Sequence, residues 1–318
     1  MNAQALVQTQ QQGPVLVVSI NNPPVNALGQ GVRAGLLAAV EQLEQDAALK
    51  AMLIVGQGKA FIAGADIREF GKPPMAPALP DVLNRMETGS KLVVAAIHGP
   101  ALGGGLEVAM ATHFRVALAG AKLGLPEVNL GLLPGAGGTQ RSPRLMGVKA
   151  ATELMLSGQH LSAKAALAAG LVDKLAEGDD PLAAGLAYVN ELLARGVPPR
   201  RTRDLAIADK AAALAELDAI ALESVKKTRG LFSPAKIIEC VRAAVELPFE
   251  QGLKRERELF LECLNSPQRQ GLVHAFFAER ETAKIPEAKA AAPRALASIA
   301  VIGGGTMGAG ITVSALDA

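Results

Sequence analysis

Short apolar runs alternate with a helical pattern in the first half of the chain, and this alternation limits the possible folds more than any other feature. The runs at 15–20, 51–55 and 92–97 predict buried strands, while the apolar spacing of residues 31–45 predicts a helix. Glycines and prolines crowd into residues 56–147, where they supply turns between such elements. Strands that alternate with helices predict an α/β architecture.

The sequence pattern changes after about residue 172 and suggests four parts. Good helix formers with charged faces fill the region beyond a proline-rich hinge near residue 198. We therefore predict an α/β body at 1–197 and a helical extension at 198–283. An Ala/Pro/Lys-rich linker at 284–296 and the start of a further domain at 297–318 complete the chain.

Composition supports a folded chain and argues against several functions. The 318 residues suit about two domains, and a sizeable core can form because 50% of the residues are hydrophobic and 19% are charged. A net charge of +2 and 3% aromatic residues without tryptophan argue against nucleic-acid binding. No apolar run approaches the ~20 residues of a membrane helix, and the N-terminus lacks a signal-peptide pattern. We expect no nucleic-acid partner and no membrane partner.

Cysteine and histidine patterns indicate neither a disulfide framework nor a metal site. The chain has two cysteines, Cys240 and Cys263, and its four histidines lack the spacing of metal ligands. An ordinary buried or exposed histidine is the simpler hypothesis in each case. We expect a reduced compartment and no metal.

Two glycine-rich segments can bring backbone N–H groups to a ligand. In KAFIAGADIREF (59–70), small residues follow a strand and leave the backbone accessible. In GPALGGGLEVAM (99–110), three glycines stand at the expected start of a helix, where free N–H groups and the helix dipole favour negative charge. One N–H from each segment would form an oxyanion hole for a thioester carbonyl that becomes an enolate.

Two carboxylates accompany these glycines. Glu107 falls in the first turn of the expected helix, and Glu127 follows 20 residues later, ahead of a cluster formed by Gly135, Gly137 and Gly138. A pair of carboxylates around one substrate can divide the work, one activating water and the other protonating carbon. Either glutamate alone would more often be an ordinary acid at a helix start. Their joint order with the glycines favours a site for a thioester substrate.

Four motifs carry a family resemblance: PVNAL (24–28), AGADI (63–67), ALGGGLE (101–107) and PE…GLLPGAGGTQR (126–141). From about residue 15 to 175 the chain resembles the crotonase (enoyl-CoA hydratase/isomerase) superfamily. This resemblance implies an α/β fold with a ββα spiral core. The extension further resembles the multifunctional β-oxidation enzymes, in which a 3-hydroxyacyl-CoA dehydrogenase follows the hydratase/isomerase domain.

The resemblance also implies a role for individual residues. Ala65 and Gly104 match the two amide donors of the oxyanion hole. Glu107 matches the carboxylate that orients and deprotonates water, Glu127 the one that protonates C2, and Gly135 a backbone position near that water. The positions that match the lining of the CoA moiety are Lys59, Ala60, Phe61, Ile62, Asp66, Ile67 and Arg68.

The function implied by the resemblance is hydration of trans-2-enoyl-CoA to 3-hydroxyacyl-CoA in fatty-acid β-oxidation, accompanied by Δ3,Δ2-enoyl-CoA isomerase activity. This chemistry needs no metal or cofactor, and the acyl-CoA is the substrate. We expect a monomer or a homotrimer, in a bacterial cytoplasm or alternatively in a peroxisome. The alternative function is a non-catalytic CoA-binding or interaction module.

The C-terminal segment carries a dinucleotide-binding fingerprint. Gly303, Gly305 and Gly308 follow a strand-like run at 297–302 and precede a helix start. The motif needs an acidic residue about 20 positions on, yet only 15 residues follow Gly303. We therefore expect a truncated Rossmann start that does not bind NAD here. NAD would serve only a longer parent enzyme, and an oxidoreductase function is rejected for these 318 residues.

Overall fold

The computed structural model describes residues 5–69, 72–228, 230–282, 284–285, 291 and 295–317. These residues form two compact units, Met1–His274 and Ala275–Ala318, which are described separately. The α/β body and most of the helical extension lie in the first unit. The four predicted parts of the chain, with boundaries at 197, 283 and 296, stay a prediction.

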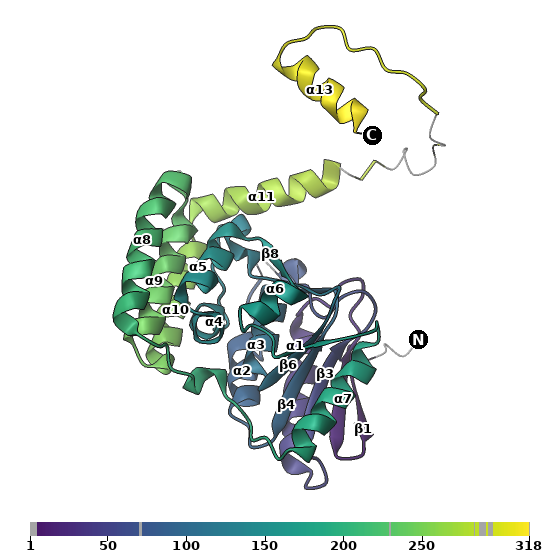
Figure 1. The fold of residues 1–318 in the computed structure, drawn as a ribbon, viewed down its shortest axis with the longest axis vertical. Coiled ribbons are helices and arrows are strands. Elements are labelled where there is room, and N and C mark those ends of the chain that lie inside the picture. The colour runs from purple at the N-terminus through teal and green to yellow at the C-terminus, as the bar shows by residue number, and fades with distance from the viewer. Residues whose placement is uncertain are drawn as a thin grey trace. The chain divides into compact units, whose positions relative to one another are not determined.

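The first unit is organised around a six-stranded sheet with the order β1-β2-β3-β4-β6-β9 (Figure 1). Its first strand pairs antiparallel with its neighbour, and the other pairings are parallel. The strands are β1 (Val7–Gln12), β2 (Val15–Ile20), β3 (Ala51–Gly56), β4 (Leu92–Ile97), β6 (Phe114–Leu118) and β9 (Lys174–Ala176). The strands predicted at 15–20, 51–55 and 92–97 are thus confirmed.

A smaller sheet of three strands lies in the same unit. Its strands are β5 (Pro100–Leu102), β7 (Lys122–Gly124) and β8 (His160–Ser162), in that order. β5 follows β4 almost directly, and β7 follows β6 in the same way, so each close pair gives one strand to each sheet. A helical element comes after each pair, which is the ββα repeat expected from the sequence.

Helices cover both faces of the large sheet. Alternate residues of β2 point into two separate cores: Leu16 and Val18 into one, Val15 and Val17 into the other. α7 closes the second core by packing on β3, β4 and β6. The helices of the body are α1 (Gln30–Gln45), α2 (Leu79–Glu87), α3 (Gly104–Ala111), α4 (Gly138–Met146), α5 (Val148–Ser157), α6 (Ala163–Ala168) and α7 (Pro181–Ala194). α1 confirms the helix predicted at 31–45.

Three short 3₁₀ helices connect these elements: η1 (Ile67–Glu69), η2 (Pro126–Leu130) and η3 (Thr202–Asp204). The predicted helical extension is confirmed as well. It consists of α8 (Lys210–Thr228), α9 (Phe232–Glu246), α10 (Phe249–Leu264) and α11 (Pro267–Thr282). α9 and α10 pack on α4, and the apolar face of α9, including Ile237 and Val241, belongs to the core of the body. The extension therefore completes the folded body.

The second unit holds α13 (Thr306–Leu316), which begins directly after Gly305 and includes Gly308 in its first turn. The strand predicted at 297–302 is wrong, because these residues adopt no regular structure. A strand requires a partner for its backbone hydrogen bonds, and no described residue pairs with this run. The linker predicted at 284–296 lies mostly outside the described residues. Within the described ranges, no helix is long and apolar enough to cross a bilayer.

Candidate active site

Glu107 and the glycine cluster come together as the spacing predicts. Glu107 lies in the first turn of α3, a helix whose residues are all buried, and is itself only 3% exposed. Its Oε1 accepts hydrogen bonds from the backbone N–H of Ala136 at 2.7 Å and of Gly138 at 2.8 Å. A Cβ on Gly138 would lie 2.8 Å from the same oxygen, so a side chain there would displace the carboxylate.

Glu127 reaches the start of the same helix from another element. It lies in the first turn of η2, directly after Pro126, and its Oε2 is buried without a hydrogen-bond partner among the described residues. A Cβ on Gly103 would lie 2.9 Å from its Oε1. Gly103 caps α3 with φ 52° and ψ −126°, a conformation that L side chains rarely adopt. Sequence analysis noted the three-glycine run but missed Gly103 as an individual site residue.

The surroundings of the two glutamates favour different protonation states. Burial raises the pKa of Glu107, while the amides of Ala136 and Gly138 and the charge of Arg141 lower it. Burial raises the pKa of Glu127 well above its usual range, and the charge of Glu107 raises it further. On balance the pKa of both carboxyl groups lies above the usual range, and that of Glu127 is shifted further, so Glu107 loses its proton first as the pH rises.

The two segments expected to form the oxyanion hole lie side by side. Leu102 N–H donates to the carbonyl of Ile62 at 3.0 Å, and Ile62 N–H donates to the carbonyl of Pro100 at 3.2 Å. Gly104 is the first residue of α3, where the helix itself provides no acceptor for the N–H. A Cβ on Gly104 would lie 3.9 Å from the backbone nitrogen of Ala65, an exposed residue. The two amides therefore occupy one small region at the start of α3.

The seven residues expected to line the CoA moiety differ in exposure. The side chains of Ala60, Phe61 and Ile62 are buried in the core, so this stretch can offer a ligand only its backbone. Asp66 is buried and forms an ion pair of 2.7 Å with Arg68, whose side chain is 74% exposed.

Lys59 is exposed, and the side chain of Ile67 lies outside the described residues. Lys59 and Arg68 are therefore the cations of this stretch that a phosphate could reach. All seven CoA contacts stay predictions.

Gly135 faces the helical extension. A Cβ at this position would lie 2.5 Å from Cδ2 of Phe260 on α10. The backbone role near a water molecule that the resemblance implies is not tested by this contact and stays a prediction.

Sequence analysis also missed Glu256, a third carboxylate at the site. Glu256 lies on α10, is 2% exposed, and accepts hydrogen bonds from Gly137 and Thr139. The sequence feature that could have revealed it is spacing: Glu256 lies on the same face of the helix as the buried residues Gly252, Leu259 and Cys263.

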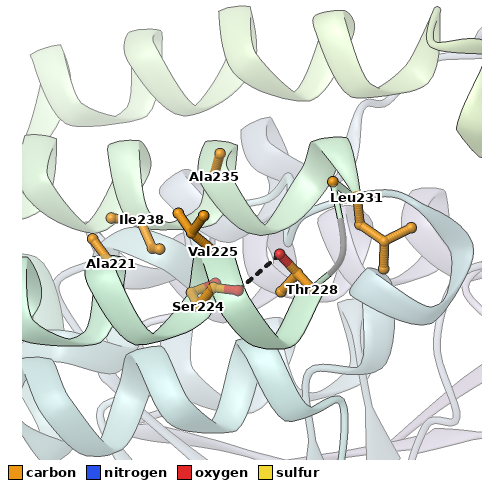
Figure 2. A pocket seen from close by; sticks show the side chains of 8 residues that line it. Ala221, Ser224, Val225, Thr228, Leu231, Ala235 and Ile238 are labelled. Atoms are coloured by element: carbon orange, nitrogen blue, oxygen red, sulfur yellow. Dashed lines mark hydrogen bonds between the residues drawn. The ribbon is translucent and has the colours of Figure 1, made fainter.

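A separate cavity of about 330 Å³ lies between α8 and α9 (Figure 2). It is lined by small and apolar side chains, including Ala221, Val225 and Ile238, together with Ser224 and Thr228. Thr228 Oγ1 donates to the carbonyl of Ser224 at 2.9 Å. None of the described residues that line this cavity carries a charge. In the part of the chain that the structure describes, no three His, Cys, Asp or Glu side chains gather as a metal site requires.

The chain is an α/β protein in which two glutamates, Glu107 and Glu127, lie near the start of α3. The model of the family described as enoyl-CoA hydratase/isomerase matches residues 10–198, so the chain belongs to this family. This confirms the resemblance to the crotonase superfamily.

Curated relatives match most of the chain, the extension included. The peroxisomal bifunctional enzyme of Danio rerio is 42% identical over 305 residues, which cover 94% of this chain and 42% of the relative. The human peroxisomal bifunctional enzyme is 39% identical over 316 residues, covering 96% and 43%. The chain thus spans less than half the length of these relatives.

Solved structures share the fold. An enoyl-CoA hydratase/isomerase from Pseudoalteromonas atlantica aligns with a TM-score of 0.64 and 27% identity. The alignment covers 86% of this chain and 97% of that one.

Proposed function

We propose that this chain adds water to a trans-2-enoyl-CoA and forms a 3-hydroxyacyl-CoA. The observation that carries the proposal is that Glu107 and Glu127 both lie near the start of α3, next to the two segments that carry the Ala65 and Gly104 amides. The partnerless Oε2 of Glu127 supports it, because a buried polar atom of this kind is suited to a substrate or water partner.

In the proposed reaction, the N–H groups of Ala65 and Gly104 hold the thioester oxygen and stabilise the negative charge that it gains. Glu107 accepts a proton from water while the water oxygen bonds to C3. The electron pair of the double bond moves toward the carbonyl, and C2 then takes a proton from Glu127. Glu107 has gained one proton and Glu127 has lost one, so a proton returns to Glu127 before the next turnover.

An isomerase activity follows from the same groups. Glu127, in its carboxylate form, removes a proton from C2 of a Δ3-enoyl-CoA and returns it to C4, while the two amides hold the intermediate dienolate. No water is consumed in this path, so Glu107 is not needed as a base.

For a longer protein that includes this chain, we propose a second activity, NAD-dependent 3-hydroxyacyl-CoA dehydrogenation. The fingerprint glycines and the bifunctional names of the relatives support it. In the described residues, however, Gly303 and Gly305 are exposed, Gly308 is partly buried, and none of the three lies beside a sheet. This arrangement does not fit a dinucleotide, so no step of the proposed hydration is assigned to NAD.

Two further expectations concern the setting of the protein. The names of the curated relatives favour the peroxisome, which was the alternative compartment; the bacterial cytoplasm stays a prediction. Assembly as a monomer or a homotrimer also stays a prediction.

Paired substitutions test the proposed function. Glu107→Gln and Glu127→Gln should each lower hydration by about 10²–10⁴-fold, because each removes one general acid or base. Binding of the CoA ester should survive, since neither change alters the backbone amides. The assay is the loss of enoyl-thioester absorbance, with the exposed Glu153→Gln on α5 as a matched control.

Unchanged turnover in either variant would show that the site is wrongly assigned. A parent chain that binds acyl-CoA without turnover would support the non-catalytic alternative instead.

A further inference from the structure

Four consecutive residues, Ala136 to Thr139, lie between two carboxylates. The N–H groups of Ala136 and Gly138 donate to Glu107 Oε1 at 2.7 and 2.8 Å. The N–H of Gly137 donates to Glu256 Oε1 at 2.7 Å, and that of Thr139 to Glu256 Oε2 at 3.1 Å. Successive amides therefore alternate between an acid on α3 and an acid on α10.

The local backbone explains this alternation. α4 begins at Gly138, and the first N–H groups of a helix have no acceptor within the helix. Gly137 has φ 95°, a left-handed conformation that turns the chain just before α4. With one carboxylate on each side, none of the four amides stays unpaired.

Glu256 accepts three hydrogen bonds, from the N–H groups of Gly137 and Thr139 and from the Thr139 hydroxyl. Thr139 Oγ1 donates to its Oε2 at 2.5 Å, and Gln140 Nε2 donates to that same hydroxyl at 2.9 Å. All three groups that contact Glu256 are donors, so both of its oxygens act as acceptors. A glutamine here would turn an NH₂ group toward at least one N–H.

Burial of this acid is unfavourable for stability. Desolvation raises the pKa of Glu256 to about 8, and the charge of Glu107 adds to the shift. The titratable groups that act on it or respond to it are Glu107 on α3, Glu127 on η2, Arg141 on α4 and Cys240 on α9. An apolar residue at this helix position would avoid the desolvation. Burial of Glu256 therefore lowers the stability of the fold, while its hydrogen bonds hold the Gly137–Thr139 backbone next to Glu107.

We propose that Glu256 is a positioning residue for hydration: it fixes the Gly137–Thr139 backbone so that the neighbouring amides keep the Glu107 carboxylate directed at the water. The inference rests on the proposed function. It makes the helical extension part of the active site, although none of its residues needs to touch the substrate.

The central test is Glu256→Gln, measured by kcat, KM, pH profile and hydrogen exchange. We expect kcat to fall about 10- to 100-fold, since displacement of a catalytic group by 1 Å can cost about 10²-fold. KM should stay within about twofold, because the thioester contacts are untouched. The alkaline limb of the pH profile should move to lower pH, since the charge of Glu256 raises the pKa of Glu127. Amides 136–139 should exchange faster.

Two sets of controls keep the test specific. Glu258→Gln changes an exposed acid of the same helix, which pairs with Arg255, and should match the parent in every measurement. Thr139→Val removes only the hydroxyl donor and should lower kcat by a smaller factor in the same direction. Thr139→Ser keeps both donors and should match the parent.

The outcomes separate the two proposals. A folded Glu256→Gln variant with the parental kcat and pH profile overturns the positioning role. If that variant does not fold, a Thr139→Val variant with unchanged kcat and exchange overturns it equally. Absence of turnover in the parent rejects the proposed function, and exchange of amides 136–139 still tests the positioning.

Discussion

Replacing Gly103 with alanine should impair catalysis through a single close contact. The added Cβ would lie 2.9 Å from Glu127 Oε1, about 0.5 Å short of the 3.4 Å at which ordinary contact begins. The carboxyl group must move by about that amount, which is the tolerance of a catalytic group. Since 1 Å can cost about 10²-fold, we expect kcat for enoyl-CoA hydration to fall about 10- to 100-fold.

The same substitution also strains the backbone. Gly103 has φ 52°, and a non-glycine residue in such a region costs about 1–3 kcal/mol. At about 2–4 °C per kcal/mol for a chain of this size, the melting temperature should fall by roughly 2–12 °C. Activity is therefore assayed at 25 °C and normalised to the folded fraction.

Gly147→Ala is the matched control for Gly103→Ala. Gly147 has φ 82°, but a Cβ there meets no atom within 4 Å. This variant should lose thermal stability while it keeps the parental kcat. If Gly103→Ala retains full kcat, or if Gly147→Ala loses as much, then the contact with Glu127 does not govern the rate and the reasoning is wrong.

Three further predictions follow from the site and the fold. Glu127→Gln should raise the melting temperature at pH 8 but not at pH 4. Because the pKa of Glu127 is raised in the folded state above 4.5, its contribution to folding stability is present at low pH and is lost as the pH rises through the folded-state pKa. A neutral glutamine avoids that loss, so it should stabilise the fold most at high pH. Gly104→Ala should lower kcat about 10²-fold, because its Cβ would lie 3.1 Å from Leu79 Cδ2 and shift the amide; unaltered kcat would remove Gly104 from the oxyanion hole. Deletion of 297–318 should leave melting and turnover nearly unchanged, since α13 has no buried residue, whereas a chain that ends at Arg203 should aggregate; a large loss of melting temperature in the short deletion contradicts this.

Local sequence signals predicted the parts of the fold that are buried on both sides. β3 and β4 are continuous apolar runs, and α1 carries its apolar residues on one face, so each pattern has a single interpretation. The first-turn positions of Glu107 and Glu127 were equally legible, because glycine or proline marks the start of each helical element.

Elements that depend on strand pairing rather than on their own composition were harder to predict. β1 (VQTQQQ) is a polar edge strand, held by antiparallel pairing with β2, and its sequence carries no apolar alternation. The run at 297–302 has the opposite property, since its composition suits a strand but no described strand lies beside it. Burial and pairing, which composition does not specify, decided both cases.

Glu256 shows the same limit at the candidate site. Its neighbours in sequence, Arg255 and Arg257, are charged, so the sequence alone suggests one more acid on a solvated helix face. Its partner Gly137 lies 119 residues away in sequence. Only the docking of α10 on α4 brings the two together.

The distance in sequence between Gly137 and Glu256 means that the two residues are synthesised at different times. A ribosome adds about 5–20 residues per second, so roughly 6–24 s pass between synthesis of Gly137 and of Glu256. During this interval the sheet is completed by β9 (Lys174–Ala176), and α9, whose apolar face belongs to the core of the body, is made just before α10. If Glu256 positions the Gly137–Thr139 backbone as proposed, the arrangement around Glu107 becomes complete only when α10 packs on α4.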